Sequence, residues 1–246
     1  MTAGMLSGAG DFALWVYLSR TPLLWLTVTL AAYVLADCVS AASGRHPLAN
    51  PVLHAIWLVG AVLAVTGTPY RTYFEGAQFV HFLLGPATVA LAVPLYENRA
   101  TVLRALVPML AALLVGAVTA LATALLVARA LGVPDAVLVS LAPKSVTAGV
   151  AMGITEALGG DPALTAVLVI LTGILGAVVV TPLMDLARVR DFRARGFAAG
   201  LAAHGIGTAR AFQVSDVAGT FAGIAMGLNA LVTAVLVPLA LALVRR

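Results

Sequence analysis

Charged residues are scarce in this chain, and their scarcity decides its class. Of 246 residues only 10% are Asp, Glu, Lys or Arg, whereas 62% are hydrophobic. A soluble domain carries about 25% charged residues, so this chain has too little polar surface to face water on all sides. The composition excludes an ordinary soluble enzyme or binding module. It predicts an all-α fold, a polytopic bundle of transmembrane helices.

Cysteine, histidine and lysine are also rare. The single cysteine, Cys38, excludes an intrachain disulfide and a metal site built from several cysteines. The four histidines are scattered without a metal-ligand spacing, so neither a metal nor any other cofactor is expected. Lys144 is the only lysine in a chain that otherwise uses arginine, and it directly follows Pro143 inside an apolar segment. Its position requires an explanation.

Motifs for nucleic-acid binding and for catalysis are missing as well. The pI of 9.7 alone could suggest a nucleic-acid partner, but the arginines stand mainly at the ends of apolar runs, where they act as topology signals. No glycine-rich phosphate loop, nucleophile elbow or HExxH motif is present. We therefore expect no nucleic-acid partner and no enzymatic activity.

Eight apolar segments are candidates for crossing the membrane, within one domain that covers residues 1–246. They are residues 22–42, 51–67, 79–97, 103–131, 136–157, 162–187, 195–211 and 216–244. Residues 1–20 are too short to span a bilayer and are predicted to lie at its interface. If all eight segments cross, nine arginines share one face and three the other. This bias predicts that both termini and the loop 188–195 are cytoplasmic.

Two stretches of the chain share a weak internal similarity. "LGPATVALAVPLYENRA" and the long apolar run after it resemble "LAPKSVTAGVAMGITEA" and its own following run. Residues 79–131 and 136–188 are therefore predicted as repeat units, although chance similarity is a rival explanation in a chain rich in Ala, Val and Leu. Eight crossings would give both units the same orientation, whereas many transporters contain inverted repeats.

Three apolar segments are interrupted by helix-breaking residues. The predicted breaks are at Gly85 and Pro86, at Pro143, and at Gly205 and Gly207. Backbone groups freed in lipid cost several kcal/mol, so broken helices persist where they line a cavity or pack inside protein. Simple kinks are the alternative. The polar or charged residues beside all three breaks favour a functional site.

Two cations inside the predicted membrane segments are the sharpest candidates for that site. Lys144 and Arg210 each cost about 2.5–3.5 kcal/mol at a helix centre, unless their side chains reach the interface. Beside half-helix N-termini they would instead bind a buried anion. The nearby hydroxyls of Ser145, Thr147 and Thr208 would orient that anion. His204 is a candidate for proton coupling, with a packing role as the alternative.

Small residues recur at helical spacing in two segments and predict close helix packing. These two sets are Ser145, Gly149 and Gly153, and Gly219, Gly223 and Gly227. Together with the habit of the family described next, they favour a homodimer.

Four stretches together resemble the LrgB/CidB family of bacterial membrane proteins. They are "NPVL" (50–53), "YFEGAQFVHFLLGPATVALAVPLYENR" (73–99), "LAPKSVT" (141–147) and "AHGIGTAR" (203–210). The resemblance covers most of the chain from about residue 22 onward. It implies a multi-pass protein of the bacterial inner (cytoplasmic) membrane. The family motifs fall here on Pro143, Lys144, Ser145, Thr147, His204, Gly205, Gly207, Thr208 and Arg210.

The resemblance implies two kinds of activity. Family members are described as antiholin-like or holin-like factors that act with a small membrane partner, LrgA or CidA, on murein hydrolase activity and lysis. Plastid relatives move glycolate and glycerate, and some bacterial relatives are linked to pyruvate uptake. The small partner is absent from this chain and would be a separate protein.

The cations, hydroxyls and breaks favour a secondary transporter of small monocarboxylates such as glycolate, glycerate, pyruvate or lactate. In this hypothesis Lys144 and Arg210 hold the carboxylate anion. The alternative is a holin-like regulator of lysis whose small-residue faces serve assembly. A third hypothesis is a scaffold for an LrgA/CidA-like partner. The sequence leaves the substrate, the coupling ion and the need for a partner open.

Overall fold

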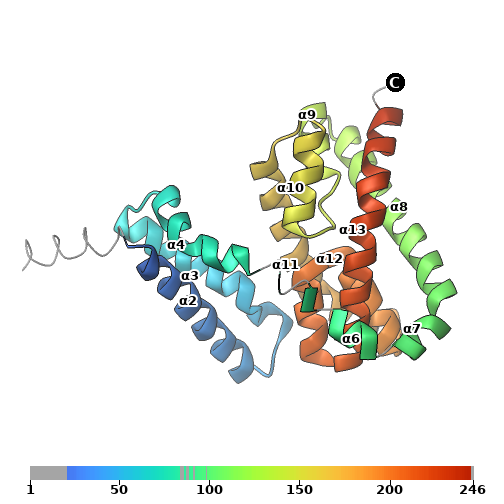
Figure 1. Cartoon of the computed structure of the whole chain (residues 1–246), viewed down its shortest axis with the longest axis horizontal. Helices are drawn as coiled ribbons and strands as arrows, with labels where there is room; N and C mark the ends of the chain where they lie inside the picture. Colours follow the sequence, from blue (N-terminus) through green and yellow to red (C-terminus); the bar gives the residue numbers. More distant parts are fainter. Residues whose placement is uncertain (1–20, 84–85, 87–88, 91, 98, 245–246) are drawn as a thin grey trace, which may run out of the picture. The chain divides into compact units, whose positions relative to one another are not determined.

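The computed structural model describes residues 21–83, 86, 89–90, 92–97 and 99–244, and the regular structure in these ranges is helical (Figure 1). The chain divides into two compact units, residues 1–90 and 91–246, which we describe separately. The predicted interfacial segment 1–20 lies outside the described residues, as does Gly85 of the first predicted break. The predicted repeat that begins at residue 79 extends across this incompletely described region.

Within residues 21–83, unit 1 contains three α-helices and one short 3₁₀-helix. They are α2 (Pro22–Ala42), η1 (Pro47–Ala49), α3 (Pro51–Thr66) and α4 (Tyr70–Phe82). Trp25 of α2 is fully buried and lies edge-on to Tyr73 of α4, with 6.0 Å between ring centroids. Gly76 allows this close crossing, because a Cβ atom there would overlap the carbonyl oxygen of Pro22.

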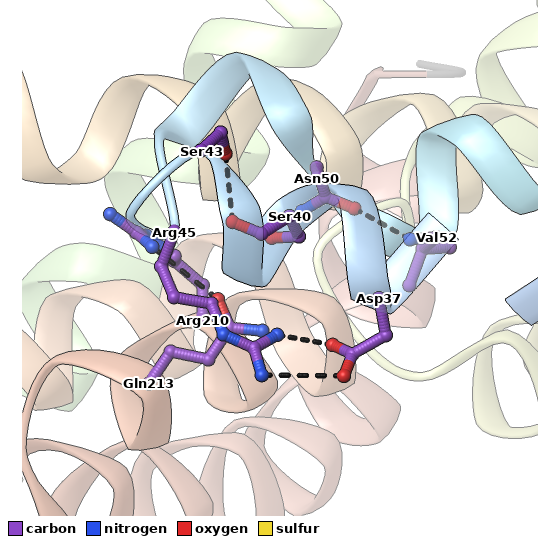
Figure 2. Close-up of polar contacts among 8 residues, drawn as sticks. All are labelled: Asp37, Ser40, Ser43, Arg45, Asn50, Val52, Arg210 and Gln213. Atoms are coloured by element: carbon purple, nitrogen blue, oxygen red, sulfur yellow. Dashed lines mark hydrogen bonds and ion pairs between the residues drawn. The ribbon is translucent and has the colours of Figure 1, made fainter. Parts of the chain in front are cut away.

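Polar side chains fix the connection between α2 and α3. Asn50 is the N-cap of α3 and accepts a hydrogen bond from the N–H group of Val52 at 2.9 Å (Figure 2). It also accepts one from the N–H group of Leu53 at 3.2 Å, as expected for Asn followed by Pro at a helix start. The guanidinium of Arg45 forms an ion pair with Asp37 (Figure 2). The loop after α2 is therefore held to the end of that helix.

Unit 2 contains the remaining helices. They are α6 (Ala92–Glu97), α7 (Arg99–Arg104), α8 (Leu106–Ala130), α9 (Asp135–Leu141), α10 (Ala148–Ala157), α11 (Pro162–Leu186), α12 (Phe192–Val214) and α13 (Asp216–Val244). Within the described ranges α2, α8, α11 and α13 are long and apolar enough to cross a bilayer. The protein is a polytopic helical membrane protein, as the composition predicts.

The long helices of unit 2 do not all run in the same direction. Near their starts, Met109 of α8 and Phe221 of α13 share one hydrophobic cluster, and Leu125 and Leu241 share another near their ends. These two helices are therefore parallel. The start of α13 and the loop 188–195 lie at one end of unit 2, called here the arginine end. The ends of α8 and α13 mark the opposite end.

α11 runs antiparallel to α8 and α13. Near its start, the Thr165 hydroxyl donates to the carbonyl of Ser140 at 3.0 Å, and α9, which carries Ser140, packs at the opposite end through Leu138. Near its end, Val180 packs against the cluster that contains Ala218 of α13. α11 therefore begins at the opposite end and finishes at the arginine end.

α12 is a hairpin of two short arms and not one continuous helix. Its backbone leaves the helical region at Ala203 (φ −126°, ψ 18°) and His204 (φ 41°, ψ −132°). After this reversal Ala211 packs with Ala199, twelve residues earlier. In a straight helix these two residues would be about 18 Å apart. The second arm therefore returns alongside the first, toward the arginine end.

α9 and α10 form a second hairpin that starts from the opposite end. A turn over residues 142–147 separates the two helices. After it the chain returns to the opposite end, where a Cβ atom at Gly160 would meet side-chain atoms of Val139, Ser140 and Thr155. In unit 2, α6, α7 and α8 are thus followed by two hairpin-plus-helix pairs, residues 135–186 and 192–244. These pairs have opposite orientations.

Residues 136–157 and 195–211 therefore do not each cross once, as the count of eight crossings assumed; they are broken segments that return to the end from which they start. Arms of about ten residues are about 15 Å long, which is half of a hydrocarbon core of about 30 Å, and each segment folds back on itself. Eight crossings would place Arg104 and the loop 188–195 on different faces, but Arg104 and Arg193 line one cavity. The loop and the end of α13 lie at different ends of unit 2, so these two segments do not share one face; the N-terminal residues 1–20 lie outside the described residues.

Candidate functional site

The two hairpins of unit 2 meet at Asn229, near the middle of α13. The Nδ2 group of Asn229 donates to the carbonyl of Ser145 in the 142–147 turn at 3.2 Å, and to the carbonyl of Leu201, just before the α12 reversal, at 3.0 Å. One side chain therefore binds the interrupted backbone of both hairpins. We call this region, with the residues of the two reversals, the hairpin junction.

The Asn229 amide is fully used in these contacts. Its side chain is 1% exposed, and both of its N–H donors have carbonyl acceptors. Its Oδ1 atom accepts a hydrogen bond from the Thr233 hydroxyl, one turn later, at 3.2 Å. Two facing carbonyls require the NH₂ group on their side, so the network itself sets the orientation of the amide. Buried polar groups in such a network specify one arrangement of the elements that they join.

His204 lies at the α12 reversal and is 4% exposed. Its Nε2–H group donates to the carbonyl of Val169, in α11, at 2.9 Å. This bond leaves Nδ1 as the nitrogen that gains or loses a proton. The positive φ of His204 is unusual for a residue with a side chain and costs on the order of 1–3 kcal/mol. Packing of the ring against α11 holds the residue in this conformation.

Gly173 of α11 makes the contact between His204 and α11 possible. A Cβ atom at position 173 would lie 2.6 Å from Cε1 of His204 and 2.8 Å from Cδ1 of Ile206. These distances are shorter than side chains tolerate, so only glycine lets the ring reach the carbonyl of Val169. The next glycine along this face, Gly176, likewise accommodates Ala203.

Lys144 belongs to the 142–147 turn, between fully buried Pro143 and half-buried Ser145. It is half-buried and directly precedes Ser145, whose carbonyl Asn229 binds. Among the described residues no carboxylate lies within ion-pair distance of its ammonium group. The junction therefore combines a lysine and a histidine, with no acidic side chain to balance a positive charge.

The three predicted hydroxyls have different surroundings. Thr208 is buried and donates to the carbonyl of His204 at 2.8 Å, which stabilises the first turn after the reversal. Thr147 is the N-cap of α10, but its side chain makes no capping hydrogen bond. Ser145 contributes its carbonyl to Asn229, and its half-buried side chain lies beside that contact. Ser145 and Thr147 are thus the hydroxyls on the same turn as Lys144.

Arg210 lies away from the reversal. It is six residues beyond His204 on the second arm of α12, about 9 Å along the helix, and lines a small cavity with Arg195. Its guanidinium donates to the side-chain oxygen of Gln213 at 3.3 Å (Figure 2). Arg195 pairs with Asp185 at 2.7 Å. The structure thus gives Lys144 and Arg210 separate surroundings.

The predicted break residues also take different positions. Pro143 lies in the turn between α9 and α10. The interruption of α12 falls at Ala203 and His204, just before Gly205, so Gly205 and Gly207 belong to the returning arm. Gly207 permits the close approach of the two arms, because a Cβ atom there would lie 2.5 Å from the carbonyl oxygen of Ala199. Pro86, in the first predicted break, is exposed.

Sequence reasoning missed Asn229, the residue on which the junction is centred. The available signal was a single asparagine in the middle of an apolar segment, followed by Thr233 one helical turn later. A polar side chain at that depth usually bonds to a neighbouring helix. The described residues contain no group of three His, Cys, Asp or Glu side chains that could hold a metal.

Comparison with known proteins places these residues in a family context. The model of the LrgB-like family matches residues 29–243, a span that includes the whole hairpin junction. The match confirms the resemblance predicted from the four sequence stretches. No solved structure matches the chain.

Individual relatives agree with the family match. The holin-like protein CidB of Staphylococcus epidermidis is 30% identical over 222 residues, which cover 90% of this chain and 96% of that protein. CidB of Staphylococcus aureus is 31% identical over 216 residues, which cover 88% and 94%. The uncharacterized protein YwbG of Bacillus subtilis is 39% identical over 176 residues, or 72% of this chain and 78% of YwbG.

Proposed function

Since this chain belongs to the LrgB-like family, we propose that it is a membrane carrier for small monocarboxylate anions that bind at the hairpin junction. The observation that carries this proposal is the half-buried Lys144 at the hairpin junction, without an acidic partner among the described residues. An ammonium group within the membrane costs about 2.5–3.5 kcal/mol or more. An anionic substrate would offset this cost.

The surroundings of Lys144 suit a carboxylate. The α10 N-terminus follows the turn directly, and N-terminal N–H groups favour anions. Ser145 and Thr147 on the same turn have hydroxyls that can donate to a carboxylate or to a 2-hydroxy or 2-oxo group. We propose that these three residues bind the anion and that His204 couples its movement to a proton.

Arg210 would have a separate role. Because it lies about 9 Å further along the returning arm, we propose that it holds the anion at a second position, nearer the arginine end. Each cation would then bind the substrate in turn. Thr208 would act indirectly, by stabilising the α12 reversal.

Uptake of labelled pyruvate, glycolate, lactate and glycerate into proteoliposomes tests the proposal. We expect saturable uptake of at least one acid by the wild type, and a loss of more than about 100-fold in Lys144→Gln, because a charge-assisted hydrogen bond and the neutralising charge are both removed. Lys144→Arg controls for charge alone. Arg210→Gln should raise KM more than it lowers the maximal rate.

A second candidate function is a holin-like regulator of lysis that acts with an LrgA/CidA-like partner as a separate chain. Relatives named holin-like protein CidB support it. The α10 surface also supports it, since Cβ atoms at Gly149 and Gly153 would meet nothing within 4 Å and a second copy or a partner helix could pack there. Folded protein without uptake, together with a lysis phenotype unchanged by Lys144→Gln but lost in Gly153→Leu, would favour this function over transport.

A further inference from the structure

A cavity of about 760 Å³ lies between α8 and α12 at the arginine end of unit 2. Three charged residues, Arg104, Asp191 and Arg193, line one part of it. Its other walls are apolar or small, and include Ala112, Gly116, Phe197, Leu201 and Phe221. Its volume is typical of a ligand pocket, but few of its residues offer specific polar contacts. The cavity is therefore suited to an amphiphile.

The depth of the cavity matches one leaflet of a membrane. Its walls run from Ala105, the N-cap of α8 at the arginine end, to Gly116, eleven residues or about 16 Å further along. This is half of a hydrocarbon core of about 30 Å. At its inner limit α8 and α12 come together, because a Cβ atom at Gly116 would lie 3.0 Å from two methyl groups of Leu201.

The charged end of the cavity is positive. Arg193 is paired with Asp191, with 2.6 Å between Nη2 and Oδ2, so these two charges largely cancel. Arg104 is exposed, and no ion-pair partner for it occurs among the described residues. Basic pockets between membrane helices bind anionic lipid headgroups, and each arginine near the surface contributes about fivefold in affinity.

We propose that this cavity binds an anionic phospholipid. Its phosphate contacts Arg104, and one acyl chain lies along the apolar wall between α8 and α12. The polarity of the cavity, cationic at one end and apolar over the depth of one leaflet, is complementary to such a lipid. This site is distinct from the Lys144 site and does not depend on the transported substrate.

Native mass spectrometry of the full chain can test the headgroup contact. Detergent-purified protein is incubated with equal amounts of phosphatidylglycerol and phosphatidylcholine that carry identical acyl chains. We expect the wild type to retain about fivefold more phosphatidylglycerol, and Arg104→Gln to lose this preference. Arg99→Gln is the matched control, because Arg99 is also exposed but stacks on Tyr96 at 4.5 Å and does not line the cavity.

A pair of adjacent variants can test the acyl-chain contact. Ala112→Trp fills the cavity and should reduce retention of both lipids at least fivefold. Ala111→Trp adds the same side chain at the next, exposed position, which does not line the cavity, and should bind like the wild type. Equal retention of the two lipids by the wild type would overturn the proposal. So would unchanged phosphatidylglycerol binding in Arg104→Gln and Ala112→Trp.

Discussion

The two hairpins of unit 2 have the same topology but are held in place by different interactions. The first arm of α12 packs against α13 without intervening side chains, since Cβ atoms at Gly196 and Gly200 would overlap the carbonyl oxygens of Ala218 and Ala222. The α9–α10 hairpin is joined to α11 by hydroxyl groups, centred on Thr165. Its outer α10 face is open.

This difference indicates which hairpin is free to move. Close-packed glycine contacts leave no room for small displacements, so the α12 hairpin and α13 behave as one rigid element. The α9–α10 hairpin carries Lys144; among the described residues it packs against α13 through Leu138, Val139 and Ala142, and its tip is bonded to α13 from Asn229 to the Ser145 carbonyl. Exchange of that bond is the smallest change that would separate the two hairpin tips. In a carrier, the α9–α10 hairpin would therefore move relative to a fixed α12.

Removing the bridge between the hairpins should have the largest effect on stability. Asn229→Leu keeps the volume but leaves the carbonyls of Ser145 and Leu201 without their donor, and each lost partner costs about 1–3 kcal/mol. We expect a loss of about 2–6 kcal/mol in the free energy of unfolding, measured in mixed micelles. Thr233→Val removes only the hydroxyl that donates to Asn229. An equal loss in both variants would show that Asn229 does not bridge the hairpins.

Glycine-to-alanine substitutions on the two hairpins should change the stability of the protein in opposite directions. Gly200→Ala forces the first arm of α12 away from the Ala222 carbonyl and should destabilise the protein by about 2–3 kcal/mol. Gly149→Ala lies on the open face of α10 and should stabilise it by about 0.5–1 kcal/mol, because alanine favours the helix. Thermal unfolding of both variants measures the contrast. Equal tolerance at the two positions would contradict the rigid packing of α12.

The hydroxyl network at the base of the α9–α10 hairpin should contribute less to stability than the Asn229 bridge or the close packing of α12. Thr165 is fully buried, and its hydroxyl lies 3.0 Å from the Ser140 carbonyl and 2.9 Å from the Thr155 hydroxyl. Thr165→Val should cost about 1–2 kcal/mol and increase hydrogen exchange in α9 and α10 more than in α12. Thr172→Val is the control, since that hydroxyl bonds only to its own helix. Uniform exchange changes would mean that Thr165 does not anchor this hairpin.

Removing the N-cap of α12 should have the smallest effect on stability. Asp191 accepts from the N–H group of Arg193 at 2.8 Å, so Asp191→Ala should cost about 1 kcal/mol. The hydrogen bond from the Arg193 side chain lowers the pKa of Asp191. The stability that the ionised Asp191 carboxylate contributes is therefore fully present above the pKa of an unfolded aspartate, about 3.9. It is lost as the pH falls through the lower pKa of Asp191 in the folded protein. A stability difference between wild type and Asp191→Asn that does not shrink at acidic pH would contradict this role.

The sequence alone determined the class of the protein and most of its helices. A hydrophobic fraction of 62% leaves lipid as the only suitable solvent, and the apolar runs at 22–42, 103–131, 162–187 and 216–244 correspond closely to α2, α8, α11 and α13. The single lysine after a proline lies in the turn that meets the α12 hairpin at Asn229, and its role as an anion ligand stays a prediction. The family followed from short motifs around these same residues.

Tertiary structure alone decided how the interrupted segments are used. Hydropathy reports the solvent that a segment prefers, and two short returning arms have the same composition as one crossing helix. The direction of each segment is fixed by contacts between distant residues, such as Gly207 with Ala199 and Asn229 with Ser145 and Leu201. For the same reason the separation of Lys144 from Arg210 could not be predicted, because it depends on where α12 reverses.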